Sequence, residues 1–139
     1  MYIKHETYVD LKTAKLLKQV GFDWACDLYF SELVDAPAEA GIVDEDTNKV
    51  YGVFAVDVCG MPHEEDLLRP TLAVAQKWLR EHGNWIVSVC FDAESYVLDV
   101  FQDYLCYLPY REYEDYDEAL SDGIYQCLQF YIEHENEDD

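Results

Sequence analysis

The sequence predicts an α+β fold of two layers, with one mostly antiparallel sheet and three helices packed on one of its faces. Apolar residues at three- and four-residue spacing mark three helices, and alternating apolar residues mark the strands. Neighbouring strand candidates are joined by short turns, which favours antiparallel pairing. The 139 residues, half of them hydrophobic, suffice for one core. We therefore expect a single domain over residues 1–139, with a frayed acidic tail at 134–139.

The stretch 69–89 is the clearest unit, an amphipathic helix followed by a strand. Pro70 suits a helix start, because its fixed φ is already helical. Gly83 suits a helix end, because glycine adopts the left-handed conformation without strain. The strand begins at Trp85, where apolar residues alternate. The apolar stripe of the helix comprises Leu72, Ala75, Trp78, Leu79 and His82.

The segment before this unit contains a second helix and three strand candidates. Asp10 is expected to cap a helix over Leu11–Val20 that ends at Gly21. A strand is expected at Trp24–Phe30. The other pieces are loops at Glu32–Ala40 and Gly60–Asp66 and a hairpin with arms Ile42–Val43 and Val50–Val58.

The segment after this unit predicts a further strand and the third helix. A strand is expected at Tyr96–Tyr104, and Cys106–Glu114 is expected to be irregular around Pro109. The last helix starts near Asp115. Gly123 inside this helix costs about 1 kcal/mol relative to Ala, so we expect another element to approach closely there.

The net charge of −21, from 30 acidic and 9 basic residues, excludes several function classes. Nucleic-acid binders neutralise phosphates with Lys and Arg, and anionic lipids attract the same residues. We therefore expect no direct nucleic acid and no membrane as partner. The charge favours a basic partner instead.

No motif in the sequence predicts a catalytic or metal site. Asp44-x-Asp46-x-Asn48 opens like a calcium loop, but the sixth and twelfth positions are Lys49 and Ala55 where Gly and Glu are needed. Cys59-x-x-x-His63 offers two ligands, whereas a closed zinc site needs four. We expect no catalytic residues, no metal and no cofactor.

The five cysteines, at positions 26, 59, 90, 106 and 127, form no C-x-x-C pair. Most lie within apolar patterns, where a free cysteine behaves as a small hydrophobic residue. The N-terminus is too polar for a signal peptide, and no apolar run approaches the length of a membrane span. These features predict a cytoplasmic protein.

Charge asymmetry is the feature that rises above background. From Asp92 to Asp139 there are fifteen acidic residues and one basic residue, Arg111, with tyrosines interleaved. Tyrosine is a preferred interface residue. The expected partner-binding residues are Asp99, Asp103, Tyr107, Tyr110, Glu112, Tyr113, Glu114, Asp117, Glu118 and Asp122.

These residues predict a non-enzymatic protein that binds a basic protein surface. In a narrower version, the carboxylates imitate nucleic acid and occupy the groove of a DNA- or RNA-handling protein. Two alternatives stay open: a small enzyme or ligand-binding domain with a pocket beside the central helix, and a self-associating structural protein. The oligomeric state is also open.

Three segments, at 13–22, 69–81 and 116–120, resemble a group of small uncharacterised acidic proteins of phages and mobile elements of gut bacteria. The resemblance covers about a quarter of the chain and only its helices. It implies a phage or mobile-element context, in which inhibitors of host defence nucleases are a class to consider. No functional residue carries over.

Self-repulsion among the acidic residues predicts that salt stabilises the protein. The midpoint of thermal unfolding should rise between about 0.02 M and about 0.5 M sodium chloride, because the screening length falls below the spacing of the surface charges. Circular dichroism melting curves measure this midpoint. An unchanged or falling midpoint would show that repulsion does not limit stability.

Overall fold

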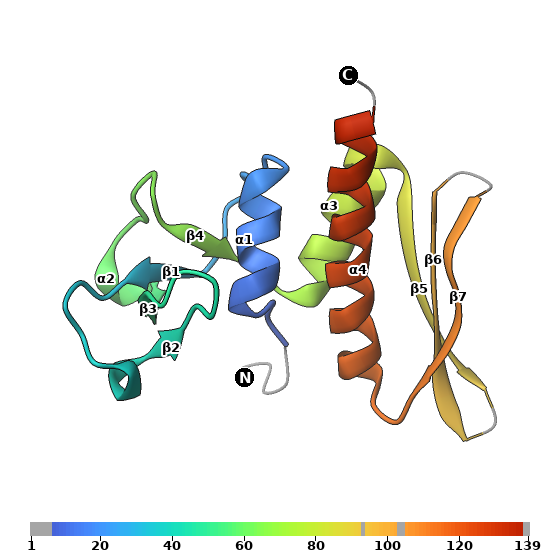
Figure 1. Cartoon of the computed structure of the whole chain (residues 1–139), viewed down its shortest axis with the longest axis horizontal. Helices are drawn as coiled ribbons and strands as arrows, with labels where there is room; N and C mark the ends of the chain where they lie inside the picture. Colours follow the sequence, from blue (N-terminus) through green and yellow to red (C-terminus); the bar gives the residue numbers. More distant parts are fainter. Residues whose placement is uncertain (1–6, 93, 103–104, 138–139) are drawn as a thin grey trace. The chain divides into compact units, whose positions relative to one another are not determined.

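The computed structural model describes the backbone of residues 7–92, 94–102 and 105–137. Side chains are described for these residues except 92, 105–110 and 135–137. The described chain is α+β and contains two antiparallel sheets, one of four strands and one of three (Figure 1). It forms two compact units, Tyr8–Pro70 (the N-terminal unit) and Thr71 onward together with Thr7 (the C-terminal unit).

The N-terminal unit contains a four-stranded sheet in the order β2-β3-β1-β4. Its helix α1 is capped by Asp10, whose carboxylate accepts from the Thr13 amide, as the sequence predicts. The buried core is Val9, Leu11, Ala14, Leu17, Phe22, Tyr29, Phe30, Val50 and Leu67. The elements are α1 (Leu11–Gln19), β1 (Leu28–Glu32), η1 (Ala38–Ala40), β2 (Ile42–Val43), β3 (Val50–Ala55), α2 (Val56–Cys59) and β4 (Leu67–Arg69).

The C-terminal unit contains a three-stranded sheet in the order β5-β6-β7, with α3 against β5 and α4 against all three strands (Figure 1). Its core includes Trp78, Trp85, Leu98, Ile124 and Leu128, each no more than 2% exposed. The elements are α3 (Leu72–Gly83), β5 (Trp85–Asp92), β6 (Ser95–Gln102), β7 (Leu105–Tyr113) and α4 (Tyr116–Glu137).

The α+β class and the antiparallel pairing are confirmed, but the strands divide between two sheets where one was expected. Two helices, α3 and α4, pack on one sheet, and α1 lies with the other. The local patterns could reveal strands but could not reveal which strands pair. A single folding domain over the whole chain stays a prediction.

Residues 106–114 were expected to be irregular, and this expectation is wrong. They lie almost entirely in β7, which pairs with β6 and contains Pro109. Proline is tolerated on an edge strand because no second neighbour needs its missing N–H. The β6–β7 register also shifts between Leu98 and Phe101, and this irregularity weakened the alternation.

Several predicted boundaries also move. The strand expected at Trp24–Phe30 is β1, which begins at Leu28 and reaches Glu32, and the arm Val50–Val58 turns into α2 after Ala55. Helix α3 begins after an N-cap at Thr71, and Asn84, not Gly83, takes the left-handed conformation at its end. Helix α4 runs to Glu137 and so includes most of the segment 134–139 expected to be frayed.

Gly123 of α4 marks the close approach that the sequence predicts. A Cβ placed there would lie 2.5 Å from Leu98 Cδ1 and 2.7 Å from Val87 Cγ1. Both contacts are to the sheet, and Gly123 itself is buried. The absence of a side chain therefore allows α4 to lie directly on β5 and β6.

We expect Gly123→Ala to lower the free energy of unfolding by about 1–2 kcal/mol, because overpacking outweighs the better helix propensity of alanine. Ser121→Ala, on the same helix, is the control and should change it by less than about 0.5 kcal/mol. Urea denaturation measures both values. Stabilisation by Gly123→Ala would show that α4 does not depend on this close contact.

Candidate functional site: an aromatic and acidic end of the C-terminal unit

Among the predicted partner-binding acids, those that the structure describes do not form one surface. Val87 and Leu98 contact α4, so the odd-numbered residues of β5 and their partners on β6 face the helices. Because strand residues alternate, Asp99 faces the opposite, helix-free side. Glu112 pairs with Val97 and shares that side. Asp117, Glu118 and Asp122 belong to α4 and lie on the helix side.

Two of these acids are engaged within the C-terminal unit. Asp117 accepts a hydrogen bond of 2.7 Å from the Thr7 hydroxyl. Asp122 accepts from the Tyr113 hydroxyl and lies 3.4 Å from the Arg111 guanidinium. Both carboxylates therefore stabilise the unit. The sequence alone does not predict this role, because it does not show which side chains meet in the folded unit.

The Tyr113–Asp122–Arg111 group shifts the pKa values of its members. Burial, together with the hydrogen bond to Asp122, raises the pKa of Tyr113, so the phenol stays protonated and donates. The hydrogen bond with Tyr113 and the charge of Asp122 raise the pKa of Arg111. The group thus fastens β7 to α4 and does not offer Asp122 as a free charge.

The remaining predicted residues are exposed or lie outside the description. Glu112, Glu114 and Glu118 are exposed to solvent. Asp103 lies outside the described residues. Tyr107 and Tyr110 belong to β7, but their side chains lie outside the described ones.

An aromatic cluster that the sequence did not single out lies at one end of this unit. Phe91, at the end of β5, is 64% exposed, and its ring lies 5.2 Å from that of Tyr96 on β6. Tyr96 in turn meets Tyr116, at the start of α4, edge to face at 5.7 Å. The available signal was the alternation of β5, which makes Phe91 the last apolar residue before the turn.

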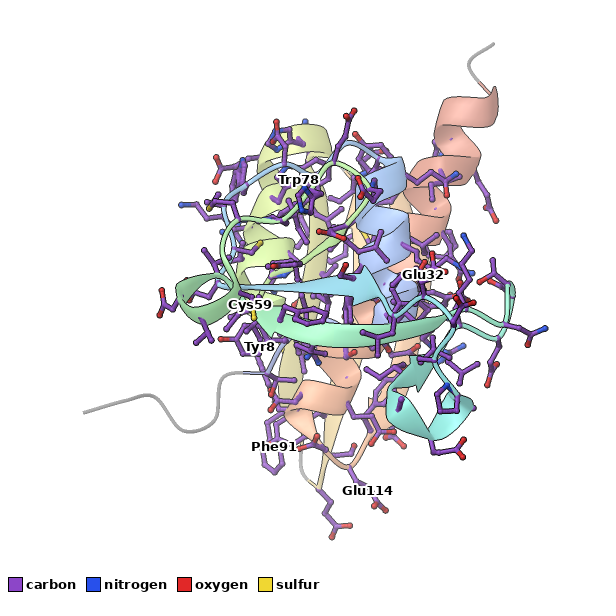
Figure 2. All side chains as sticks on the ribbon, turned by 90° about the vertical axis from the view of Figure 1, so that its left-hand side faces the viewer. Tyr8, Glu32, Cys59, Trp78, Phe91 and Glu114 are labelled. Atoms are coloured by element: carbon purple, nitrogen blue, oxygen red, sulfur yellow. The ribbon has the colours of Figure 1, made fainter. Side chains whose placement is uncertain are left out.

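Exposed carboxylates lie in the chain segments next to this cluster. Glu94 lies in the β5–β6 turn, and Glu114 and Asp115 lie between β7 and α4, next to Tyr116. Glu118 is in the first turn of α4, and its amide donates to the Asp115 carboxylate. Figure 2 shows Phe91 and Glu114 projecting from the same end of the unit. We call Phe91, Tyr96, Tyr116, Glu94, Glu114, Asp115 and Glu118 the aromatic–acidic end.

The aromatic–acidic end has the composition of a protein-binding surface. Interface centres are rich in aromatic residues, and charged residues at their rim fix orientation and speed association. Here the rim charges are all negative. The arrangement offers apolar contact and electrostatic attraction together, but no nucleophile paired with a base.

The turn with the calcium-like spacing is closed by a lysine from α1. Lys15 Nζ lies 2.8 Å from Asp44 Oδ2 and 3.4 Å from Asp46 Oδ2. The Thr47 hydroxyl also donates to Asp44, which is 6% exposed. Hydrogen bonding to Lys15 lowers the pKa of Asp44 and raises the pKa of Lys15. The ammonium group of Lys15 thus pairs with two of the three side chains that have the calcium-like spacing.

The cysteine side chains that the structure describes differ in burial. Cys127 is buried and Cys26 half-buried, and burial raises the pKa of Cys26 to about 11. Cys59 and Cys90 are exposed, Cys59 on α2 (Figure 2). Within the residues described, no three side chains of His, Cys, Asp or Glu come together as a metal-binding group.

A cavity of about 250 Å³ lies in the N-terminal unit, beside α1. The alternative reading of the sequence expected a pocket beside the central helix, now α3. Leu17, Phe22 and Leu68 provide the apolar wall of the cavity beside α1. Lys18 also lines it, and its ammonium donates to the carbonyls of Glu64 and Asp66. Lys18 is thus already engaged in holding the loop that contains Glu64 and Asp66.

We expect Lys15→Met to lower stability by about 1–3 kcal/mol, because Asp44 keeps a buried carboxylate with one partner fewer. The pKa of Asp44 is lowered by folding, so its contribution is present above the unfolded pKa near 4 and is lost as the pH falls through the folded value. The difference from the parent protein should therefore be largest near pH 7 and shrink in acid. Urea denaturation at several pH values measures it; a constant difference would contradict this assignment.

None of the described helices is long and apolar enough to cross a membrane. Comparison of this chain with known protein families, with curated proteins and with solved structures finds no match.

Proposed function

We propose that this protein is a non-enzymatic interaction protein that binds a basic protein surface through its aromatic–acidic end. The observation that carries the proposal is the Phe91–Tyr96–Tyr116 cluster, in which Phe91 and Tyr116 are exposed, together with the exposed carboxylates of the same end. Apolar burial supplies affinity and the carboxylates select a basic partner. The net charge of −21 extends the attraction to longer range and accelerates encounter.

Imitation of nucleic acid is the narrower form of this proposal. It requires carboxylates in two rows at the spacing of phosphates. Asp99 and Glu112 face the side of the sheet opposite to Asp122, and Asp122 is bonded to Tyr113. These facts favour a compact docking surface over two rows of carboxylates that imitate phosphates. The phage context and the inhibition of a defence nuclease stay part of the narrower form.

A second candidate function is binding of a small ligand in the cavity beside α1. The cavity volume of about 250 Å³ favours it. Lys18 donates to two backbone carbonyls, so its charge is already engaged, and Asp23 and His63 are among the other polar side chains that could orient a ligand there.

The test is charge reversal at the aromatic–acidic end. We expect the triple variant Glu94→Lys, Glu114→Lys, Glu118→Lys to bind a labelled lysine-rich peptide about tenfold or more weakly than the parent protein, because close charge pairs are lost and repulsion replaces them. Fluorescence anisotropy at low salt measures the dissociation constant.

The control triple variant Glu39→Lys, Glu45→Lys, Glu65→Lys carries the same net charge and changes exposed residues of the N-terminal unit. It should bind nearly as well as the parent protein. Equal weakening in both variants would mean that only total charge matters, and the proposed surface would be wrong.

A further inference from the structure

The outer edge of β5 is blocked over its first half and open over its second. β5 is an edge strand of the three-stranded sheet. Near its start, the side-chain amide of Gln76 on α3 donates to the Val87 carbonyl at 2.7 Å. Backbone groups of alternate residues point to the same edge of a strand, so those of Val89 and Phe91 share the outward direction of Val87. Among the residues described, no bond to these outward groups is found.

The open half of β5 lies at the end of the unit where the helices stop. Figure 1 shows the β5–β6 hairpin extending past the start of α4. Cys90 and Phe91 are exposed there, and Phe91 belongs to the aromatic–acidic end. An exposed strand edge is a ready template for an incoming strand.

We infer that β5 receives an extended, basic peptide segment of the partner as an added strand along Val89–Phe91. This inference rests on the proposed function and gives its mode of binding. Main-chain hydrogen bonds to Val89 and Phe91 would supply affinity, and alternate side chains would supply specificity.

The two faces of the sheet fix the side-chain pattern of the incoming segment. On the helix-side face its residues lie next to Val89 and Phe91, which favours apolar side chains there. On the other face they lie next to Ser88 and Cys90. Asp99 is opposite Ser88 on the next strand, so a lysine reaching across the short serine approaches this carboxylate. The segment is therefore expected to alternate lysine with apolar residues.

Charge decides between this segment and a second copy of the chain. Two copies that paired through β5 would bring two chains of net charge −21 together, with Glu94 and Asp99 of each near the join. Repulsion opposes that pairing, whereas a basic segment is attracted. The second copy therefore becomes an outcome of the test.

The experiment uses the full chain and a peptide of about eight residues that alternates lysine and valine. A twin peptide carries N-methyl groups on all of its amides, so it has the same side chains and the same charge but can donate to β5 from neither edge. We expect the twin to bind at least about tenfold more weakly by fluorescence anisotropy.

Matched variants test the strand from the protein side. Val89→Pro removes the outward N–H and leaves the ladder to β6 in place, whereas Val89→Ala keeps that N–H. We expect binding to fall about tenfold or more in the first and less than about threefold in the second. Far-UV circular dichroism and thermal melting verify that both variants fold.

Three results would overturn the inference. In the first, both peptides bind equally well and only the triple lysine variant of the aromatic–acidic end binds weakly. This result contradicts strand addition and leaves the proposed function standing. In the second, the parent protein and that triple variant bind the peptide equally well. This result contradicts both strand addition and the proposed function. A dimer seen by light scattering without peptide and abolished by Val89→Pro assigns the edge to a second copy.

Discussion

The packing of α4 on the three-stranded sheet is the constraint on which the C-terminal unit depends. At Gly123 the helix backbone lies so close to Leu98 and Val87 that a Cβ would overlap both. Ile124, Cys127 and Leu128, all fully buried, continue this contact. The helix covers one face of the sheet but begins short of the β5–β6 turn (Figure 1). That mismatch in length leaves the aromatic–acidic end uncovered.

The same packing divides the acidic residues into two groups with different roles. Asp117 and Asp122 are bonded to Thr7 and Tyr113 and hold the unit together. Glu94, Glu114 and Glu118 remain exposed. The first group contributes to stability, whereas the carboxylates of the second group make none of the described hydrogen bonds that hold the unit. Charge asymmetry in the sequence therefore showed where acidic residues concentrate, but it could not show which of these carboxylates are bonded within the unit.

Sequence patterns predicted the elements whose signals are local. Asp10 and the apolar stripe located α1, and the glycine at position 123 indicated the close approach on α4. The sequence patterns did not predict the features that depend on which strands pair with each other. Pro109 looks like a chain break until β7 is known to be an edge strand. Phe91 looks like one more strand residue until the helices are seen to stop short of it. Neither fact is encoded in neighbouring residues.

The central claim is that partners dock at one end of the C-terminal unit, and amide chemical-shift mapping tests it most directly. The full chain would be titrated with the lysine–valine peptide and its backbone amide signals followed. The account predicts that the largest changes fall on Val89, Phe91, Tyr96 and Tyr116. Changes spread evenly over the acidic surface, or concentrated around the cavity beside α1, would contradict it.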